Sequence, residues 1–201
     1  MKKAMLVLCV TLLCVTAVSA QGFKVGLKAG FNASTITNFP EVQGTTNYYL
    51  PGFQAGLMAQ SMFSRQFGLE TGLYYSTLGI KQKGTVVTVT TRPSYIQLPL
   101  TLLYKFDAGL GLLLYPQAGA YVGYGIGGKS KTTPGEISVD FFNDNMNRFD
   151  AGLTFGFNVE HSGFVVGLGY DLGLMKINKN NLVAGNDYKN ANIKVTVGHF
   201  F

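Results

Sequence analysis

The stretch 95–126, YIQLPLTLLYKF-DAGL-GLLLYPQAGAYVGYGI, alternates apolar and mixed side chains in two arms around a tight turn. In both arms the even-numbered positions are apolar, whereas the odd-numbered positions include polar residues and glycines. A period of two predicts β-strands, and the turn at 107–109 predicts that they form a hairpin. Each arm is longer than the ~5–6 residues usual for a strand in a soluble protein and suits the ~9–11 tilted residues that cross a bilayer. We therefore expect this hairpin to lie in the middle of a transmembrane β-barrel.

The beginning of the chain has the pattern of an export signal. Two lysines precede an apolar run over residues 4–18, and the small residues of VSA, ending at Ala20, fit the pattern at which signal peptides are cleaved. A membrane-anchoring helix is the alternative, but the run is too short to span a bilayer comfortably and no stop-transfer charges follow it. We expect a signal peptide at 1–20 and one outer-membrane barrel domain at 21–201.

Mass spectrometry of the mature protein would test the predicted cleavage. We expect the mature chain to begin at Gln21. Both cysteines, Cys9 and Cys14, lie in the leader, and a leucine precedes each where a lipoprotein signal carries a small residue. An intact Met1 or a lipidated cysteine would contradict the prediction.

The composition after the leader favours a barrel over a helical membrane protein. No apolar run of helix length follows residue 20, and a membrane protein without one must be a closed barrel, because lipid offers no partner for backbone polar groups. The chain has 13% charged residues, 26 glycines, 11 tyrosines and 15 phenylalanines, which agrees with that class. Its formal charge of +6 falls to +4 (6 − 2) without the two leader lysines, and no dense basic cluster indicates nucleic-acid binding. The mature chain has no cysteine, which excludes disulfides and thiol chemistry.

The whole mature chain divides into alternating segments and connections of two lengths. The alternation predicts an all-β, eight-stranded antiparallel up-and-down transmembrane β-barrel with strands at 23–32, 53–63, 67–76, 95–106, 110–126, 149–160, 164–174 and 192–201. Short connections at 64–66, 107–109 and 161–163 alternate with long ones at 33–52, 79–94, 127–147 and 175–191. Short periplasmic turns and long extracellular loops are typical of outer-membrane barrels.

The strand parity also predicts which side chains face lipid and at which height. Aromatic residues collect in two bands, as expected where rings meet the two water–lipid boundaries. The short-turn band contains Phe23, Phe63, Phe67, Tyr104, Phe106, Phe157, Phe164 and Phe201, and the other band contains Phe31, Phe53, Tyr75, Tyr124 and Phe149. We expect Leu100, Leu112, Leu153 and Leu168 to face lipid near mid-membrane, and Gln97, Thr154 and Gly169 to face the lumen.

Two features do not fit regular strands. Pro99 and Pro116 lie inside predicted strands, where each removes a donor from the hydrogen-bond ladder, and a bulge is one way to accommodate them. The segment 85–91, TVVTVTT, is also strand-like. We interpret it as an extension of the third and fourth strands above the membrane, since an independent strand would change the count.

All the charged residues within predicted strands lie on the inward face. Lys24, Lys28, Lys105 and Lys194 oppose Glu70, Asp150, Glu160 and Asp171, so four charges of each sign cancel. Isolated charges in a narrow lumen are costly, and pairing is expected. Met58, Met62, Tyr74, Tyr115 and Tyr121 are expected to fill the remaining space. A structural plug is the favoured interpretation, and a selectivity or proton-relay path is the alternative.

No group of residues indicates catalysis, a cofactor or a metal. His161 lies in a short turn and His199 faces lipid near the rim, and no serine can be tied to either with an acidic partner. Glu136, Asp140 and Asp144 crowd one long loop, but they lack the regular spacing of a calcium loop. We therefore expect neither catalytic nor metal-binding residues, and no cofactor.

The sequence resembles a known family. YIQLPLTLLYKF, YPQAGAYVGYGI, NRFDAGLTFGFNVE and GYDLGLMKI are similar to signatures of the PorT-like outer-membrane β-barrel family, whose members carry porin-family or outer-membrane β-barrel domain labels. The resemblance implies an eight-stranded barrel in the outer membrane of a Gram-negative bacterium, without a shared activity. The end of the chain, with Val195, Val197 and Phe201, resembles the aromatic-ended signal that barrel-assembly machinery recognises in its clients.

Three functions remain in competition. The first is a small non-enzymatic barrel with a plugged lumen, acting in envelope integrity, adhesion or a secretion assembly. The second is an outer-membrane enzyme acting on lipid or peptide, which would need a catalytic cluster at the extracellular rim, whereas both histidines lie at the other end. The third is a solute pore, although an aqueous channel usually needs about 16–18 strands.

The predicted partners follow from the loop charges. Nine basic residues in the long loops outnumber five acidic ones: Lys81, Lys83, Arg92, Lys129, Lys131, Arg148, Lys176, Lys179 and Lys189 against Glu41, Glu136, Asp140, Asp144 and Asp187. Such an excess attracts anionic head groups, including lipopolysaccharide phosphates. We expect outer-membrane lipid and the assembly machinery as partners, together with proteins that bind the extracellular loops.

Overall fold

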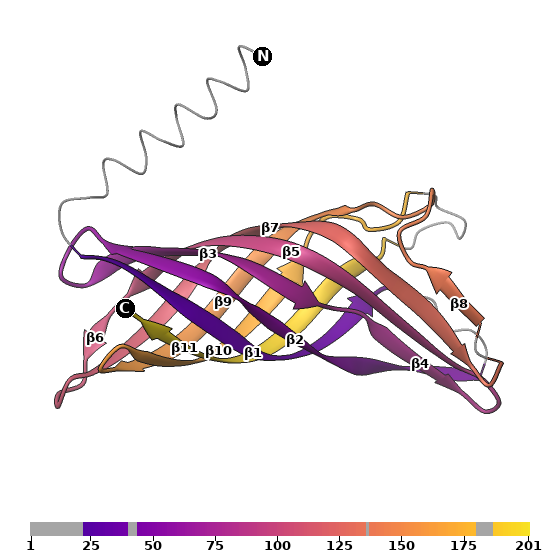
Figure 1. Cartoon of the computed structure of the whole chain (residues 1–201), viewed down its shortest axis with the longest axis horizontal. Coiled ribbons are helices and arrows are strands. Elements are labelled where there is room, and N and C mark those ends of the chain that lie inside the picture. The colour runs from indigo at the N-terminus through magenta and orange to yellow at the C-terminus, as the bar shows by residue number, and fades with distance from the viewer. Residues whose placement is uncertain (1–21, 40–43, 136, 180–186) are drawn as a thin grey trace, which may run out of the picture.

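The computed structural model describes residues 22–39, 44–135, 137–179 and 187–201, so the predicted signal peptide and both cysteines lie outside the described residues. The described residues form strands and turns (Figure 1). The strands are β1 (Phe23–Thr37), β2 (Thr45–Met62), β3 (Phe67–Thr77), β4 (Ile80–Gly84), β5 (Thr88–Tyr104), β6 (Phe106–Asp107), β7 (Leu112–Thr133), β8 (Ile137–Asp140), β9 (Phe149–His161), β10 (Phe164–Gly173) and β11 (Lys189–Phe200). Among these residues no helix is long and apolar enough to cross a membrane.

The strands close into one antiparallel ring. β1 pairs with β2 and with β11, and the ring continues from β2 through β3, β5, β7, β9 and β10 back to β11. β3 and β4 lie one after the other between β2 and β5, β6 continues the line of β5 along β7, and β8 is a short extra strand on β7. The described strands therefore make eight spans of an up-and-down barrel, and the predicted fold is confirmed.

The inward and outward faces follow the predicted parity. Leu100 and Leu168 are 53% and 61% exposed on the outer wall, whereas Gln97 and Thr154 are buried in the lumen. One height prediction is wrong: Leu112 is not near mid-membrane, because it pairs with His161 at the short-turn end of β7. The alternation of residues along a strand determines which face a side chain lies on. The position of the turn determines its depth in the membrane.

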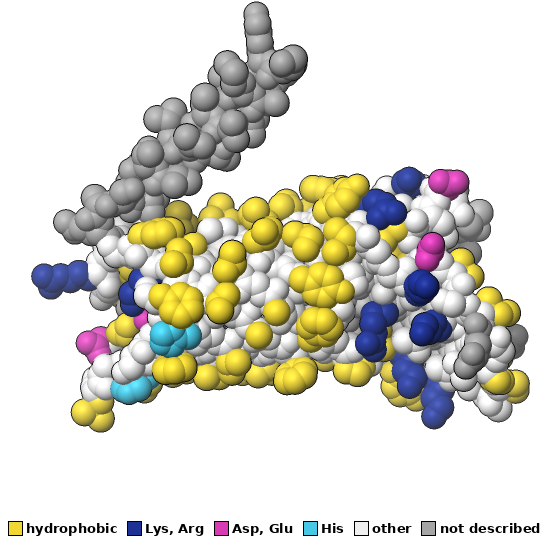
Figure 2. All heavy atoms as spheres, viewed as in Figure 1, with side chains coloured by type: hydrophobic (Ala, Val, Ile, Leu, Met, Phe, Trp, Pro, Cys, Tyr) yellow, Lys and Arg dark blue, Asp and Glu magenta, His cyan; other side chains and the backbone are white. Residues whose placement is uncertain are grey.

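Aromatic side chains form the two predicted bands around the barrel. At the short-turn end the rings of Phe67 and Tyr104 lie 4.8 Å apart, and those of Tyr104 and Phe106 lie 4.5 Å apart. At the other end Phe53 lies 5.6 Å from Tyr75. Figure 2 shows hydrophobic side chains over the middle of the barrel, while Lys and Arg gather beyond them at the extracellular end. This division is the one expected for a wall embedded in lipid.

The long extracellular connections are largely strand, which corrects the predicted loops. β1 runs on to Thr37 and β2 begins at Thr45, and β4 and β5 form a hairpin whose turn lies at 85–87. The segment 85–91 thus extends the third and fourth spans, as expected. These extensions stay folded because the alternation continues above the membrane, where inward side chains such as Ile80 and Ile36 are buried against each other.

The two prolines lie where a ladder is interrupted, without a bulge at either position. The β3–β5 pairing lapses between Thr71 and Tyr74, opposite Pro99, and resumes in the same register. Thr71 donates a hydrogen bond from Oγ1 to the Pro99 carbonyl at 2.7 Å. Pro116 remains paired in the β7–β9 ladder. On its β5 side it lies where the pairing with β7 is interrupted between β5 and β6. The ladder is therefore interrupted locally at each proline, and its register is the same on both sides of the interruption.

Candidate functional site

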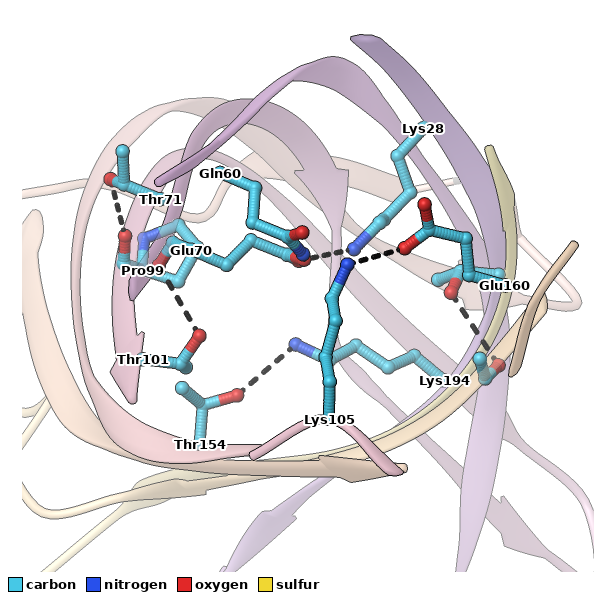
Figure 3. Close-up of polar contacts among 12 residues, drawn as sticks. Lys28, Gln60, Glu70, Thr71, Pro99, Thr101, Lys105, Thr154, Glu160 and Lys194 are labelled. Carbon is cyan, nitrogen blue, oxygen red and sulfur yellow. Dashed lines mark hydrogen bonds and ion pairs between the residues drawn. The ribbon is translucent and has the colours of Figure 1, made fainter. Parts of the chain in front are cut away.

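The lumen consists of three layers along the barrel axis. Toward the short-turn end, Met58, Tyr74, Leu103, Tyr115, Val165 and Phe200 form one buried apolar cluster. A polar layer that contains the Lys28–Glu70 and Lys194–Asp171 ion pairs crosses the middle (Figure 3), whereas Lys24, Lys105 and Glu160 lie at the short-turn end beside members of the first cluster. At the extracellular end Ile36, Ile80, Phe141 and Ile177 form a second apolar cluster, which Phe39, Phe142, Met146 and Tyr188 surround. The second cluster was missed by the sequence analysis, because its members lie in segments that were predicted to be loops.

Lys28 of β1 and Glu70 of β3 form one buried ion pair. Lys28 Nζ lies 2.5 Å from Glu70 Oε1, and the other carboxylate oxygen accepts a hydrogen bond from Gln60 Nε2 at 3.2 Å. Both side chains are almost fully buried, at 7% and 5% exposure. Because both carboxylate oxygens have a donor, this pair satisfies the requirement for burying charge.

Glu160 of β9 holds two lysines at once. Its Oε1 accepts from Lys24 Nζ at 3.0 Å and its Oε2 accepts from Lys105 Nζ at 2.6 Å. The Lys24 side chain is 42% exposed at the periplasmic mouth, whereas Lys105 is 7% exposed and its Nζ lies 4.9 Å from the centre of the Tyr115 ring. Lys105 therefore depends on Glu160 far more than Lys24 does.

Asp171 of β10 and Lys194 of β11 form the third ion-paired group of the lumen. Lys194 Nζ lies 2.6 Å from Asp171 Oδ1, which also accepts a hydrogen bond from Thr154 Oγ1 at 2.6 Å. Asn192 Nδ2 donates to Asp171 Oδ2 at 3.2 Å. The three polar partners come from two strands that flank Asp171, so they hold its carboxylate against the barrel wall.

Asp150 of β9 has no cationic partner among the described residues, which corrects the predicted pairing of four lysines with four acids. It is fully buried, at 0% exposure, and its Oδ2 accepts hydrogen bonds from Asn190 Nδ2 at 2.9 Å and from Tyr121 OH at 3.2 Å. The pairing fails because Glu160 takes two lysines. Asn190 was not predicted to face the lumen because it lies in a segment that was predicted to be a loop. The alternation of inward and outward side chains in the last strand nevertheless extends back to it.

Little space is left in the polar layer. A cavity of about 40 Å³ lies among Gln54, Tyr74, Gln97, Gln117 and Tyr121 and the ion pairs around them. One water needs roughly 10–15 Å³ measured in this way, so the cavity holds only a few. Met58, Tyr74, Tyr115 and Tyr121 are buried and fill the lumen, in agreement with the prediction.

A basic face lies on the outer surface of the extracellular extension. We use this name for Lys81 and Lys83 of β4, Arg92 of β5, and Lys129 and Lys131 of β7, all exposed. Thr90 of β5 pairs with Lys81 on one side and Lys131 on the other, and Arg92 pairs with Lys129. The basic face therefore spans three adjacent strands just above the outer aromatic band. Asp140 of β8, which pairs with Lys129, is the acidic residue beside it.

The residues weighed for catalysis or metal binding do not come together. His161 ends β9 and His199 packs against Phe164 at 4.5 Å between ring centres, so both lie at the short-turn end. Glu136 lies outside the described residues, and in the part of the chain that is described no three His, Cys, Asp or Glu side chains are grouped to hold a metal.

The predicted assembly residues lie on the closing strand. Val195 and Val197 face outward on β11, opposite Phe31 and Ala29 of β1, where the last strand meets the first. Phe201 follows the strand, is 75% exposed and packs beside His199, with ring centres 5.4 Å apart. These three side chains present an apolar edge to lipid at the seam that completes the barrel.

Comparisons with known proteins agree with this architecture. The family described as outer membrane protein beta-barrel domain matches residues 19–179. No curated protein matches the chain in sequence. Neisserial surface protein A (NspA) is 14% identical in its crystal structure, with 90% of this chain and 98% of NspA covered and a TM-score of 0.51.

Two further crystal structures are similar at lower scores. Ail, the attachment invasion locus protein of Yersinia pestis, is 16% identical, with 90% of this chain and 100% of Ail covered and a TM-score of 0.45. OprG from Pseudomonas aeruginosa is 13% identical, with 90% of this chain and 97% of OprG covered and a TM-score of 0.45.

Proposed function

This chain belongs to the outer membrane protein beta-barrel domain family and resides in the outer membrane, and from this premise we propose that it is a non-enzymatic envelope protein that acts at the cell surface through its basic face. In this role the barrel anchors the extracellular hairpins, and the hairpins bind anionic groups of the outer leaflet. The resemblance to the narrower PorT-like family stays a prediction, because the family model that matches describes outer membrane beta-barrel domains more generally. The contribution to adhesion or to a secretion assembly would use the same extracellular surface.

The observation that carries this proposal is the placement of the basic face. Five exposed cations lie on three adjacent strands, directly above the aromatic band that marks the outer boundary of the membrane. A Lys or Arg near an anionic membrane surface contributes about 1 kcal/mol of attraction, which falls off within a Debye length. The cations are thus at the height where phosphate groups of an anionic glycolipid would meet them.

Binding to vesicles that contain lipopolysaccharide tests the proposal. Replacing Lys131 by glutamine is expected to weaken binding about fivefold, and replacing Lys81 and Lys131 together about thirtyfold, because each cation contributes about 1 kcal/mol. The refolded barrel would be titrated with such vesicles and with neutral vesicles. Arg65→Gln, which removes an exposed cation from a periplasmic turn, is the matched control and should bind like the unchanged protein. Equal affinity of all the variants would contradict the proposal.

The contents of the lumen support a barrel that does not conduct. Eight strands enclose an interior that side chains can fill, and here buried ion pairs and two apolar clusters fill it. The solute-pore alternative needs a continuous aqueous path. The space in the polar layer, about 40 Å³, is far smaller than such a path.

Purified monomer in a planar bilayer is therefore expected to show no steady conductance on the scale of a porin. The measurement should use the refolded chain at a confirmed monomeric state, with an established porin as the positive control. Large, reproducible and ion-selective openings would overturn the non-conducting interpretation and place the pore function first.

The enzyme alternative has weaker support. Enzymatic action on extracellular lipid or peptide requires an acid–base group at the extracellular rim. Both histidines lie at the opposite end, where His199 packs among aromatic rings. The proposal also includes export by cleavage after Ala20 and recognition of Val195, Val197 and Phe201 by the assembly machinery.

A further inference from the structure

The outer face of the extracellular extension carries a row of four side chains that crosses four adjacent strands. Tyr48 of β2 pairs with Lys81 of β4. Lys81 in turn pairs with Thr90 of β5, and Thr90 pairs with Lys131 of β7. Residues that are directly opposite on antiparallel strands point to the same face and lie close together. The aromatic ring of Tyr48 therefore lies at one end of a row in which two cations flank a hydroxyl group, and we call these four residues the tyrosine row.

A second row lies next to the tyrosine row, further from the membrane. It consists of Thr46, Lys83, Thr88 and Thr133, one on each of the same four strands. Neither row contains an acidic residue, and Asp140 lies outside both, opposite Lys129. A hydroxyl group both donates and accepts hydrogen bonds, as the hydroxyl groups of a sugar do. The two rows together present three lysines and four threonine hydroxyls on one outward surface.

The neighbouring residues on β2 and β4 confirm that Tyr48 faces outward. Asn47 and Gln82 are paired on the inner face, where Gln82 Nε2 donates a hydrogen bond to Asn47 Oδ1 at 3.0 Å. Tyr48 and Lys81 are the adjacent residues on the two strands, and successive side chains of a strand point to opposite faces. Tyr48 is 50% exposed, so its ring is open to a ligand at the outer surface.

Tyr48 lies too high to belong to the outer aromatic band. Phe53, which is in that band, is five residues (53 − 48) further along β2. Five residues rise about 12 Å along the membrane normal, at ~3.3 Å per residue and a tilt of about 40°. The polar region of a phospholipid bilayer adds only about 5–8 Å on each side of the hydrocarbon core. The Tyr48 ring therefore lies above phospholipid head groups, at the height of the sugars of a glycolipid.

We propose that the two rows bind the phosphorylated sugar region of an outer-leaflet glycolipid. The apolar face of a sugar ring packs on the Tyr48 ring, and a phosphate group lies over Thr90 between Lys81 and Lys131. These two lysines are two strand spacings apart, about 9.5 Å, which their flexible side chains bridge by leaning toward each other. The inference rests on the surface role proposed above and deepens it, because the sugar is recognised as well as the charge.

Vesicle binding with two anionic lipids separates recognition of the sugar from attraction by charge. Lipopolysaccharide and phosphatidylglycerol would each be mixed into neutral lipid to the same surface charge and titrated against the refolded full-length barrel. Tyr48→Ser should bind lipopolysaccharide vesicles about fivefold to tenfold more weakly, because ring packing is lost, and should bind phosphatidylglycerol vesicles like the unchanged protein. Lys81→Gln should weaken binding to both kinds of vesicle.

Two further tyrosine variants serve as controls. Tyr48→Phe keeps the ring and should retain the preference for lipopolysaccharide. Tyr49→Ser removes a ring that is 54% exposed but pairs with Ile80 on the inner face, and it should bind both vesicles like the unchanged protein. Equal binding of Tyr48→Ser and the unchanged protein to lipopolysaccharide would overturn the sugar proposal, as would an equal loss on both vesicles. If Lys81→Gln weakened binding to neither vesicle, the proposed surface role itself would fail.

The height of Tyr48 has its own test, because the chain contains no tryptophan. Tyr48→Trp and Tyr124→Trp each introduce a single fluorophore, and Tyr124 is a 56% exposed member of the outer aromatic band. In bilayers with brominated acyl chains, the fluorophore at position 124 should be quenched and the one at position 48 should not. Emission from position 48 should instead change when lipopolysaccharide replaces phosphatidylglycerol at equal charge. Equal quenching at the two positions would mean that Tyr48 lies at the lipid boundary and would overturn the proposal.

Discussion

Replacing Glu160 with alanine is expected to destabilise the folded barrel by about 3–5 kcal/mol, the range found when one partner of a buried ion pair is removed. Glu160 is the counterion of both Lys24 and Lys105, and each of its carboxylate oxygens holds one of them. Lys24 can turn toward water at the mouth, but Lys105 is 7% exposed and would remain buried. The loss therefore comes mainly from the stranded Lys105 charge.

Equilibrium unfolding in urea, with refolding into the same detergent or lipid, would measure this loss. Glu160→Ala combined with Lys105→Met should recover most of the stability, because the double variant no longer buries an unpaired charge. Asp107→Ala, at an exposed turn, is the control for removing a carboxylate from the same end. If the single variant lost less than ~1 kcal/mol, water in the lumen would be solvating Lys105, and the filled interior described above would be contradicted.

Placing arginine at Leu168 or Leu100 is expected to cost about 2–4 kcal/mol, the cost of a cation on the lipid face at the bilayer midplane. Leu168 is 61% exposed, pairs with Phe157 of β9 and Val195 of β11, and lies near the middle of β10 (Phe164–Gly173). Leu100 is 53% exposed and pairs with Ala120 on β7. A guanidinium at either position has only lipid chains around it, unless its side chain bends toward an interface.

The same substitution at Leu112 is the matched control. Leu112 pairs with His161 at the short-turn rim, so Leu112→Arg should cost only about 0–1 kcal/mol. Unfolding in lipid vesicles rather than in detergent is the appropriate measurement, because a micelle adapts to a charge more readily than a bilayer. A loss at Leu112 as large as that at Leu168 would mean that the heights assigned from the strand pairing are wrong.

The pattern of residues along the chain determined the class of fold and the direction of each side chain within a strand. Successive side chains of a strand point to opposite faces, so the period of two separates a lipid wall from a lumen without any knowledge of pairing. For this reason Lys28, Glu70, Asp171 and Lys194 could be assigned to the interior and Leu100 and Leu168 to the wall. The lengths of the connections and the two aromatic bands depend only on distance along the chain, and they led to the antiparallel barrel.

Only the tertiary structure decided which interior charges meet and where the strands end. Parity says that a side chain points inward, but the partner across the lumen depends on the stagger of the closed ring, which is set by all the pairings together. Glu160 therefore holds two lysines while Asp150 has none, although the residue count alone balanced. The extracellular strands persist beyond the membrane because Ile36, Ile80, Phe141 and Ile177, which are far apart in sequence, bury one another there, and such long-range packing is invisible to a local pattern.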